Sequence, residues 1–259
     1  MNDLKISIVT ATFNSSATLP YTLESVLSQK YGNIEHIIVD GGSRDSTMDI
    51  VREYEPRYNG RLRYVSEKDN GLYDAMNKGI SMATGDVIGI LNSDDLYFDE
   101  NVVPEIADAF GDNGIGCVFG DLIFVDSTDI GRVVRTWKGS DYPVKGFFSA
   151  WHPAHPTFYA RREYFEKYGG FDLDFDVSAD FELMFRFMEK YKVKGKYLPR
   201  TFVRMRMGGE STGSISKIIE GNKNVLRAFR KNDFTPPRFY LLRRLLPKAI
   251  NLVKTKFMK

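Results

Sequence analysis

Short runs of branched apolar residues alternate along the first part of this chain with longer segments of helical spacing. The strand-like runs are residues 6–9, 36–40, 63–65 and 87–91, and the helix-like segments are residues 16–29, 46–54 and 73–82. Successive parallel strands need a crossover connection, and the crossover helices cover both faces of the sheet. The alternation therefore predicts an α/β domain built on a mainly parallel sheet flanked by helices.

The pattern becomes mixed after Asp95. We expect two strands at residues 118–124 and 132–135, a loop rich in proline, glycine and aromatic residues at 140–156, a helix at 179–191, a strand near Tyr197 and a Gly-Gly loop at 208–209. The simplest organisation is one α/β domain over residues 1–215, followed by a basic amphipathic helical tail over residues 216–259.

The net charge of +2 conceals a difference between the two parts of the chain. Residues 222–259 carry eleven basic side chains against one acid, Asp233, whereas residues 1–221 carry 25 basic and 33 acidic side chains. A basic amphipathic helix suits the interface of a membrane with anionic headgroups. A helix packed on the body with its lysines in solvent would have the same pattern. Basic charge also attracts nucleic acid, but no nucleic-acid-binding motif accompanies it, so no nucleic-acid partner is expected.

Cys117 is the one cysteine in the chain, which excludes an internal disulfide and a zinc site built from cysteines. No apolar stretch approaches the roughly 18 residues that a membrane-spanning helix needs. The first residues lead directly into a strand-like run and lack the pattern of a secretory signal. We therefore expect a cytoplasmic protein, with peripheral attachment to the inner face of the cytoplasmic membrane as a further possibility for the tail.

Two adjacent carboxylates, Asp94 and Asp95, follow the strand-like run at residues 87–91. In open α/β sheets, ligands bind just outside the carboxyl ends of the strands. Paired carboxylates repel each other unless a cation neutralises them, and oxygen ligands suit Mg²⁺ or Mn²⁺, which also binds phosphates. The plainer alternative is a turn whose acids cap the next helix. The dipeptide by itself does not decide between the two.

Asp40 and Asp180 are two further candidate acids. Asp40 ends a strand-like run just before Gly41-Gly42, where a carboxylate can bind a nucleoside or simply close a turn. Asp180 follows Ser178, a candidate N-cap, so an acid there is also favoured by the helix dipole. The functional alternative for Asp180 is a general base that takes a proton from an acceptor hydroxyl.

Several nucleotide-binding motifs are missing from the chain. There is no Gly-x-Gly-x-x-Gly after the first strand and no Gly-Lys-Ser/Thr loop, which disfavours a dinucleotide enzyme and a P-loop NTPase. A nucleotidyltransferase would carry a glycine-rich basic loop after its first strand, where this chain reads Thr-Ala-Thr-Phe-Asn-Ser at residues 10–15. A non-catalytic nucleotide-sugar-binding module is the other alternative, and it would bind a donor without turning it over.

The candidate residues occur in order within a longer set of blocks. These are SIVTATFN at 7–14, IIVDGGSRDST at 37–47, SEKDNGLYDAMNKG at 66–79, NSDD at 92–95, HPT at 155–157, GGFD at 169–172 and SAD at 178–180. Over about residues 4–212 this string resembles the family 2 inverting glycosyltransferases of GT-A fold, the bacterial group that builds surface polysaccharides.

The resemblance implies a Rossmann-like nucleotide-sugar-binding fold with a mixed, mainly parallel sheet. It also implies an inverting, hexosyl-type glycosyltransferase that depends on a divalent metal, Mn²⁺ or Mg²⁺. Such an enzyme moves a sugar from a nucleotide-diphosphate donor to a hydroxyl of a glycan or a lipid-linked oligosaccharide. The donor sugar, the base and the acceptor depend on loop contacts that the sequence does not show.

Site residues follow from the same resemblance. The nucleotide side of the donor pocket is expected to contain Thr10, Thr12, Asp40 and Asp69, with Asp40 on the base or ribose.

Asn92, Asp94 and Asp95 match the family's DxD-type motif. We expect Asp95 to be the direct metal ligand and Asp94 the second. Asn92 replaces the first acid of a strict motif and suits a ribose contact. Asp180 falls at the position of the catalytic base, where Ala179 replaces the usual adjacent glutamate.

Three further residues are weaker candidates for the acceptor or the pyrophosphate. His155 lies in an aromatic loop on the expected acceptor side. Arg204 and Arg206 begin a basic, glycine-hinged stretch that could close over the pyrophosphate. Exposed arginines at the end of a strand would have the same sequence pattern.

Overall fold

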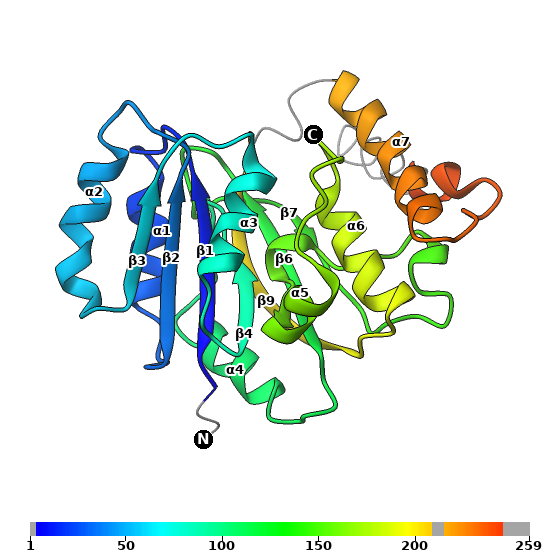
Figure 1. Cartoon of the computed structure of the whole chain (residues 1–259), viewed down its shortest axis with the longest axis horizontal. Helices are drawn as coiled ribbons and strands as arrows, with labels where there is room; N and C mark the ends of the chain where they lie inside the picture. The colour runs from blue at the N-terminus through cyan, green and yellow to red at the C-terminus, as the bar shows by residue number, and fades with distance from the viewer. Residues whose placement is uncertain (1–3, 209–214, 246–259) are drawn as a thin grey trace.

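The computed structural model describes residues 4–208 and 215–245. Within them nine strands form one sheet in the order β3-β2-β1-β4-β8-β6-β9-β5, with β7 paired to β6 (Figure 1). The strands are β1 (Ile6–Thr12), β2 (Ile34–Asp40), β3 (Leu62–Ser66), β4 (Val87–Ile90), β5 (Leu96–Tyr97), β6 (Cys117–Val125), β7 (Val133–Trp137), β8 (Tyr159–Arg161) and β9 (Gly195–Arg206). The pairs among β1 to β4 are parallel, as is the β6–β9 pair, so the prediction of a mainly parallel sheet is confirmed.

Helices cover both faces of this sheet. They are α1 (Leu19–Leu27), α2 (Thr47–Tyr54), α3 (Leu72–Met82), α4 (Val102–Ala109), α5 (Arg162–Tyr168), α6 (Ala179–Phe185) and α7 (Ile215–Lys231). Neighbouring residues of β1 point to opposite faces, since Ile8 belongs to the hydrophobic cluster that contains residues of α1, α2 and α4, whereas Val9 belongs to the cluster that contains residues of α3, α6 and α7. Burial on both faces explains why the central strands are continuous apolar runs.

Four elements were not predicted from the sequence: β5, α4, β8 and α5. The strands β5 and β8 have two and three residues, too few for a periodic signal. Arg204 and Arg206 lie at the end of strand β9, which agrees with the alternative of arginines ending a strand, although Arg206 is buried rather than exposed. The expected Gly-Gly loop falls partly outside the described residues, because Gly209 does.

The expectation that Ser178 caps a helix was wrong. Ser178 stands at the N-cap position of α6, and Ser46 at that of α2, but neither side chain makes the capping hydrogen bond. At α2 the carboxylate of Asp45 accepts from the backbone N–H of Thr47 at 3.0 Å instead. Ser178 has a φ of 71°, and its hydroxyl donates to the carbonyl of Gly221 at 3.4 Å. The geometry before α6 is therefore set by α7.

The described part of the tail packs on the body. Val225 and Phe229 of α7 are completely buried, and the rings of Phe229 and Phe185 lie 4.5 Å apart. After α7 the chain turns back and buries Tyr240, whose ring lies 4.9 Å from that of Phe229. Residues 246–254 of the expected tail helix lie outside the described residues. Across the residues that are described, no helix combines the length and apolar character needed to cross a membrane.

Glu35 joins the amino-terminal ends of β1, β2 and β4, opposite the carboxyl ends of these strands. Its buried carboxylate accepts hydrogen bonds from the Ser7 hydroxyl at 2.6 Å and the Thr84 backbone N–H at 2.5 Å, and it pairs with Lys5 at 3.0 Å. Burial alone would raise the pKa of Glu35, but these partners outweigh it and lower the pKa from 4.5 to about 2. The ionised form therefore stabilises the fold.

Replacing Glu35 with glutamine should lower the free energy of unfolding at pH 7 by about 1–3 kcal/mol, because buried donors lose a charged acceptor. Because the folded-state pKa is depressed, this contribution is present above pH 4.5 and is lost as the pH falls towards about 2. Urea unfolding of both proteins across this range measures it. The exposed Glu53→Gln variant is the control, and an equal effect of both variants at pH 7 would contradict the assignment.

Candidate active site

The predicted acids gather at the carboxyl ends of the parallel strands. Thr12 at the end of β1 lies beside Asp40 at the end of β2, and Leu91, just after β4, donates its backbone N–H to Val9 of β1. Asp69, which follows β3, packs against Gly41. A Cβ at Gly41 would lie 2.5 Å from the Asp69 carboxylate, so a larger residue at this position would displace that carboxylate. The sheet thus brings the acids that follow β2, β3 and β4 to the same edge.

Asp40 is completely buried, and its carboxylate closes the turn that follows β2. One oxygen accepts from the backbone N–H groups of Gly42 at 3.2 Å and Ser43 at 3.0 Å and from the Ser66 hydroxyl at 2.6 Å. The other accepts from the Ser43 hydroxyl. Asp40 therefore stabilises the turn after β2 with the same carboxylate that we expect to contact the nucleoside.

The two threonines of β1 are placed differently. The Thr10 hydroxyl is buried, donates to the carbonyl of Leu91 at 2.7 Å and lies 3.0 Å from Nε2 of His36, so it ties β1 to its neighbours. The Thr12 hydroxyl is buried without a hydrogen-bond partner among the described residues. An unsatisfied buried hydroxyl is costly unless a ligand completes it. Thr12 is thus the better placed of the two to contact a ligand.

Asp95 is completely buried directly after the Asn-Ser-Asp sequence. Its carboxylate accepts from the Asn92 side-chain amide at 2.9 Å and from the Arg206 backbone N–H at 3.3 Å. Burial, together with repulsion from Asp94, raises the pKa of Asp95 well above its usual range. Burial also raises the pKa of Asp94, and the Arg206 guanidinium opposes this rise. The loop after β4 therefore contains two buried acids whose ionised forms would be stabilised by a nearby positive charge.

Arg206 supplies that charge from the end of β9. It is 7% exposed, and one guanidinium nitrogen donates to the carbonyl of Ser127 at 3.1 Å. The Nε and the second terminal nitrogen are buried without a hydrogen-bond partner in the described parts of the chain, and the guanidinium lies over the Tyr21 ring, 4.7 Å from its centre. The Arg204 guanidinium lies over the Phe98 ring, 4.6 Å from its centre. Of the two arginines proposed from the sequence, Arg206 is the one beside the acids.

Few side chains at this site could bind a divalent metal ion. Among residues 4–208 and 215–245, no group of three or more His, Cys, Asp or Glu side chains is arranged to hold a metal ion. Mg²⁺ and similar ions are usually held by one or two carboxylates together with substrate phosphates and water. Asp94 and Asp95 fit a site of two carboxylates completed by phosphate and water. Each carboxylate oxygen of Asp95 accepts one hydrogen bond and keeps a further lone pair that could bind the ion.

Asp180 lies at the start of α6, where one carboxylate oxygen accepts from the Tyr73 hydroxyl at 3.3 Å. His155 is its other titratable neighbour: burial lowers the pKa of His155, while the charge of Asp180 acts to raise it. The His155 Nε2 is shielded from solvent and unpartnered within the described residues. Tyr73 was missed by the sequence reasoning, although it lies in the 66–79 block that carried the resemblance.

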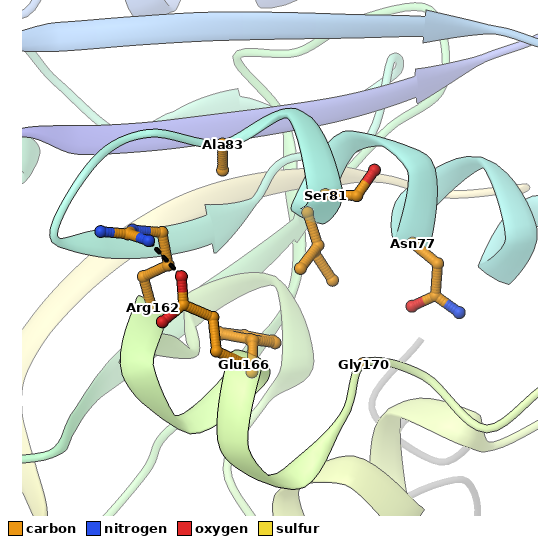
Figure 2. A pocket seen from close by; sticks show the side chains of 8 residues that line it. Asn77, Ser81, Ala83, Arg162, Glu166 and Gly170 are labelled. Atoms are coloured by element: carbon orange, nitrogen blue, oxygen red, sulfur yellow. Dashed lines mark hydrogen bonds and ion pairs between the residues drawn. The ribbon is translucent and has the colours of Figure 1, made fainter.

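A hollow of about 280 Å³ lies between the carboxyl-terminal half of α3 and α5 (Figure 2). It is lined by Asn77, Ile80, Ser81, Ala83, Arg162, Phe165, Glu166 and Gly170. Arg162 and Glu166 form an ion pair on its wall. Since the hollow shares no residue with the set of acids described above, it is separate from the candidate active site.

A mixed, mainly parallel sheet flanked by helices, with acids at the carboxyl ends of its strands, is the architecture of the GT-A glycosyltransferases. The sequence profile described as "Glycosyl transferase family 2" matches residues 7–169. A PGL/p-HBAD biosynthesis glycosyltransferase of Mycobacterium bovis is 31% identical over 193 residues, covering 74% of this chain and 73% of the relative. The chain therefore belongs to glycosyl transferase family 2 and is a glycosyltransferase.

Solved structures show the same fold. S. aureus TarS 1–349 in complex with UDP-GlcNAc aligns with a TM-score of 0.66 and 16% identity, covering 88% of this chain and 65% of that one. The chain spans 40% of a longer TarS structure. The mannosyltransferase PcManGT of Pyrobaculum calidifontis, in complex with GDP-Man and Mn²⁺, also aligns with a TM-score of 0.66, at 19% identity and with coverage of 94% and 70%.

The Arg206→Met variant should lower the free energy of unfolding by about 3 kcal/mol, because it leaves Asp94 and Asp95 without their buried countercharge. Adding Asp94→Asn should recover part of the loss, since it removes the repulsion between the acids. Urea unfolding without divalent metal measures both effects. Arg204→Met is the matched control, and equal losses from the two arginine variants would contradict the countercharge role.

Proposed function

We propose that this glycosyltransferase moves a hexosyl group from a nucleoside-diphosphate sugar to a hydroxyl of a glycan or lipid-linked oligosaccharide, with inversion at the anomeric carbon. One observation carries the proposal: contacts connect Asp180 to the carboxyl end of the sheet. Asp69 packs on Gly41 just before α3, and Tyr73 in the first turn of α3 contacts Asp180. A candidate base therefore lies beside the loops that would hold a nucleotide. The TarS and PcManGT structures with bound donors support this assignment.

The donor would bind across the loops after β1, β2 and β3. The unsatisfied hydroxyl of Thr12 and the loop shaped by Asp40 face the nucleoside, with Asp69 on the same side. The unpartnered guanidinium nitrogens of Arg206 suit the diphosphate. Asp95 and Asp94 would hold a divalent ion, and Asn92 would orient Asp95 or contact the ribose. Such an ion, when bound, stabilises the negative charge on the departing diphosphate.

Asp180 acts on the acceptor in this mechanism. Its carboxylate takes the proton from the acceptor hydroxyl while that oxygen forms a bond to the anomeric carbon. The bond from this carbon to the diphosphate oxygen breaks on the opposite face, so the configuration inverts. His155, beside Asp180 with an unsatisfied Nε2, would hydrogen-bond the acceptor. Both groups come from the second half of the chain, which also supplies Arg206 to the donor side.

The Asp180→Asn variant should reduce turnover by about 10²–10⁴-fold, because an amide cannot accept the proton, while donor affinity stays unchanged. A thermal-shift panel of UDP, GDP, dTDP and CMP compounds, with Mn²⁺ or chelator, first selects the donor. Release of the nucleoside diphosphate then measures turnover. The exposed Asp176→Asn variant controls for loss of an acid in the same loop, and near-normal turnover by Asp180→Asn would remove it from the role of base.

We also propose that the end of the described chain binds a membrane surface rich in anionic lipid. Residues 240–245 are helical, with Tyr240 packed on the body. Phe239 and Leu242 are 65% and 60% exposed, and the exposed Arg238 and Arg243 stand next to them. Exposed apolar side chains beside basic ones suit the interface of an anionic bilayer.

Replacing Phe239 and Leu242 together with serine should at least halve flotation with vesicles containing phosphatidylglycerol, because the inserted apolar area is lost. Unmodified protein should not float with pure phosphatidylcholine. Val144→Ser is the control, since Val144 is fully exposed elsewhere on the surface. Equal flotation of the double variant and the unmodified protein would exclude this surface from membrane binding.

A further inference from the structure

We propose that Tyr73 is a positioning residue for Asp180: its hydroxyl holds one carboxylate oxygen and so leaves the other aimed at the acceptor. The inference rests on the proposed role of Asp180 as the base. It adds to that role a residue of the donor-side helix α3, to which neither the resemblance nor the charge pattern assigned a function.

The contact between the two side chains is direct. The Tyr73 hydroxyl lies 3.3 Å from one Asp180 carboxylate oxygen, and the Tyr73 ring packs on Phe171 with centroids 5.3 Å apart. Burial, together with the charge of Asp180, raises the pKa of Tyr73. Tyr73 therefore stays protonated at neutral pH and donates to the carboxylate. A general base needs one free oxygen, and a fixed donor on the other oxygen decides which one it is.

The backbone before Asp180 needs support from outside its own helix. Ser178 has a φ of 71°, a conformation that costs a non-glycine residue free energy and persists only where neighbours hold it. From α7, Asn224 donates to the carbonyl of Val177 at 2.9 Å, and the Gly221 carbonyl accepts from the Ser178 hydroxyl. These contacts fix the backbone from α7, whereas the Tyr73 hydroxyl contacts the Asp180 carboxylate and also interacts with the backbone N–H groups of Ser178 and Asp180.

The same face of α3 also holds the loop that leads to α6. Asn77, one turn beyond Tyr73, donates to the carbonyl of Phe171 and accepts from its backbone N–H, both at 2.8 Å. In Figure 2, Asn77 extends from α3 towards the chain at Gly170, where a Cβ would collide with its side-chain oxygen. Tyr73 therefore projects from a helix that is hydrogen-bonded to the loop before α6, so its hydroxyl has a defined position relative to Asp180.

The Tyr73→Phe variant tests the inference because it keeps the ring and removes only the hydroxyl. Turnover number should fall about tenfold, as expected for loss of one hydrogen bond to a charged group. The KM for the donor and the melting temperature should not change. The assay follows release of UDP or GDP from UDP-GlcNAc or GDP-mannose to water with Mn²⁺. Tyr164→Phe, a partly buried tyrosine of α5, is the matched control and should behave as the unmodified chain does.

A double-variant cycle separates the possible outcomes. In the Asp180→Asn background, Tyr73→Phe should cause no further loss, because its effect passes through the carboxylate. Full activity of Tyr73→Phe beside an inactive Asp180→Asn overturns this inference alone. A raised donor KM or a lowered melting temperature shows a packing role and also overturns it. Near-normal turnover of Asp180→Asn, or no turnover by the unmodified chain with any donor of the thermal-shift panel, overturns the proposed function first and this inference with it.

Discussion

The rest of the structure depends on the pairing of β1 with β2 and β4, which is completed by a buried polar contact just below the carboxyl ends of these strands. The Thr10 hydroxyl of β1 bonds the carbonyl of Leu91 and meets His36 of β2, whose other ring nitrogen lies 3.0 Å from the Tyr58 hydroxyl. Burial lowers the pKa of His36 to about 3, so the ring is neutral and adds no charge to the core. A buried network satisfied in this way fixes a single register. That register sets Thr12 beside Asp40 and brings the chain after β4 to the other side of β1.

Charge at the proposed donor site does not favour the stability of the fold. Asp94 and Asp95 are buried together, and the raised pKa of each shows that the fold does not favour their ionised forms. Arg206 offsets part of the repulsion, yet two of its nitrogens are unpartnered in the described chain. A diphosphate with a divalent ion would satisfy both deficits at once. In the proposed donor site, such unsatisfied charge on a rigid strand end would preorganise the pocket for its ligand.

The second half of the chain adds the acceptor side to this frame. The aromatic core between α6 and α7, with Phe185 and Phe229 at its centre, holds α6 against the sheet. Helix α7 also holds the backbone at Val177 and Ser178, directly before Asp180. Although α7 was expected to belong to a tail, its described residues complete the surroundings of the proposed base. Membrane contact, as proposed, falls to the exposed residues that follow it.

The sequence by itself determined the α/β class, the parallel strands at residues 6–9, 36–40 and 87–91 and the glycosyltransferase family, because apolar periodicity and ordered motifs are local properties. It missed β5 and β8, which have too few residues for a periodic signal, and it left open whether Arg206 lies in a loop or at the end of a strand. Only the tertiary structure brought Arg206 to Asp94 and Tyr73 to Asp180, which are 112 and 107 positions apart in the sequence. Such contacts depend on strand order and helix packing, which arise from burial over the whole domain. A local sequence pattern therefore cannot predict them.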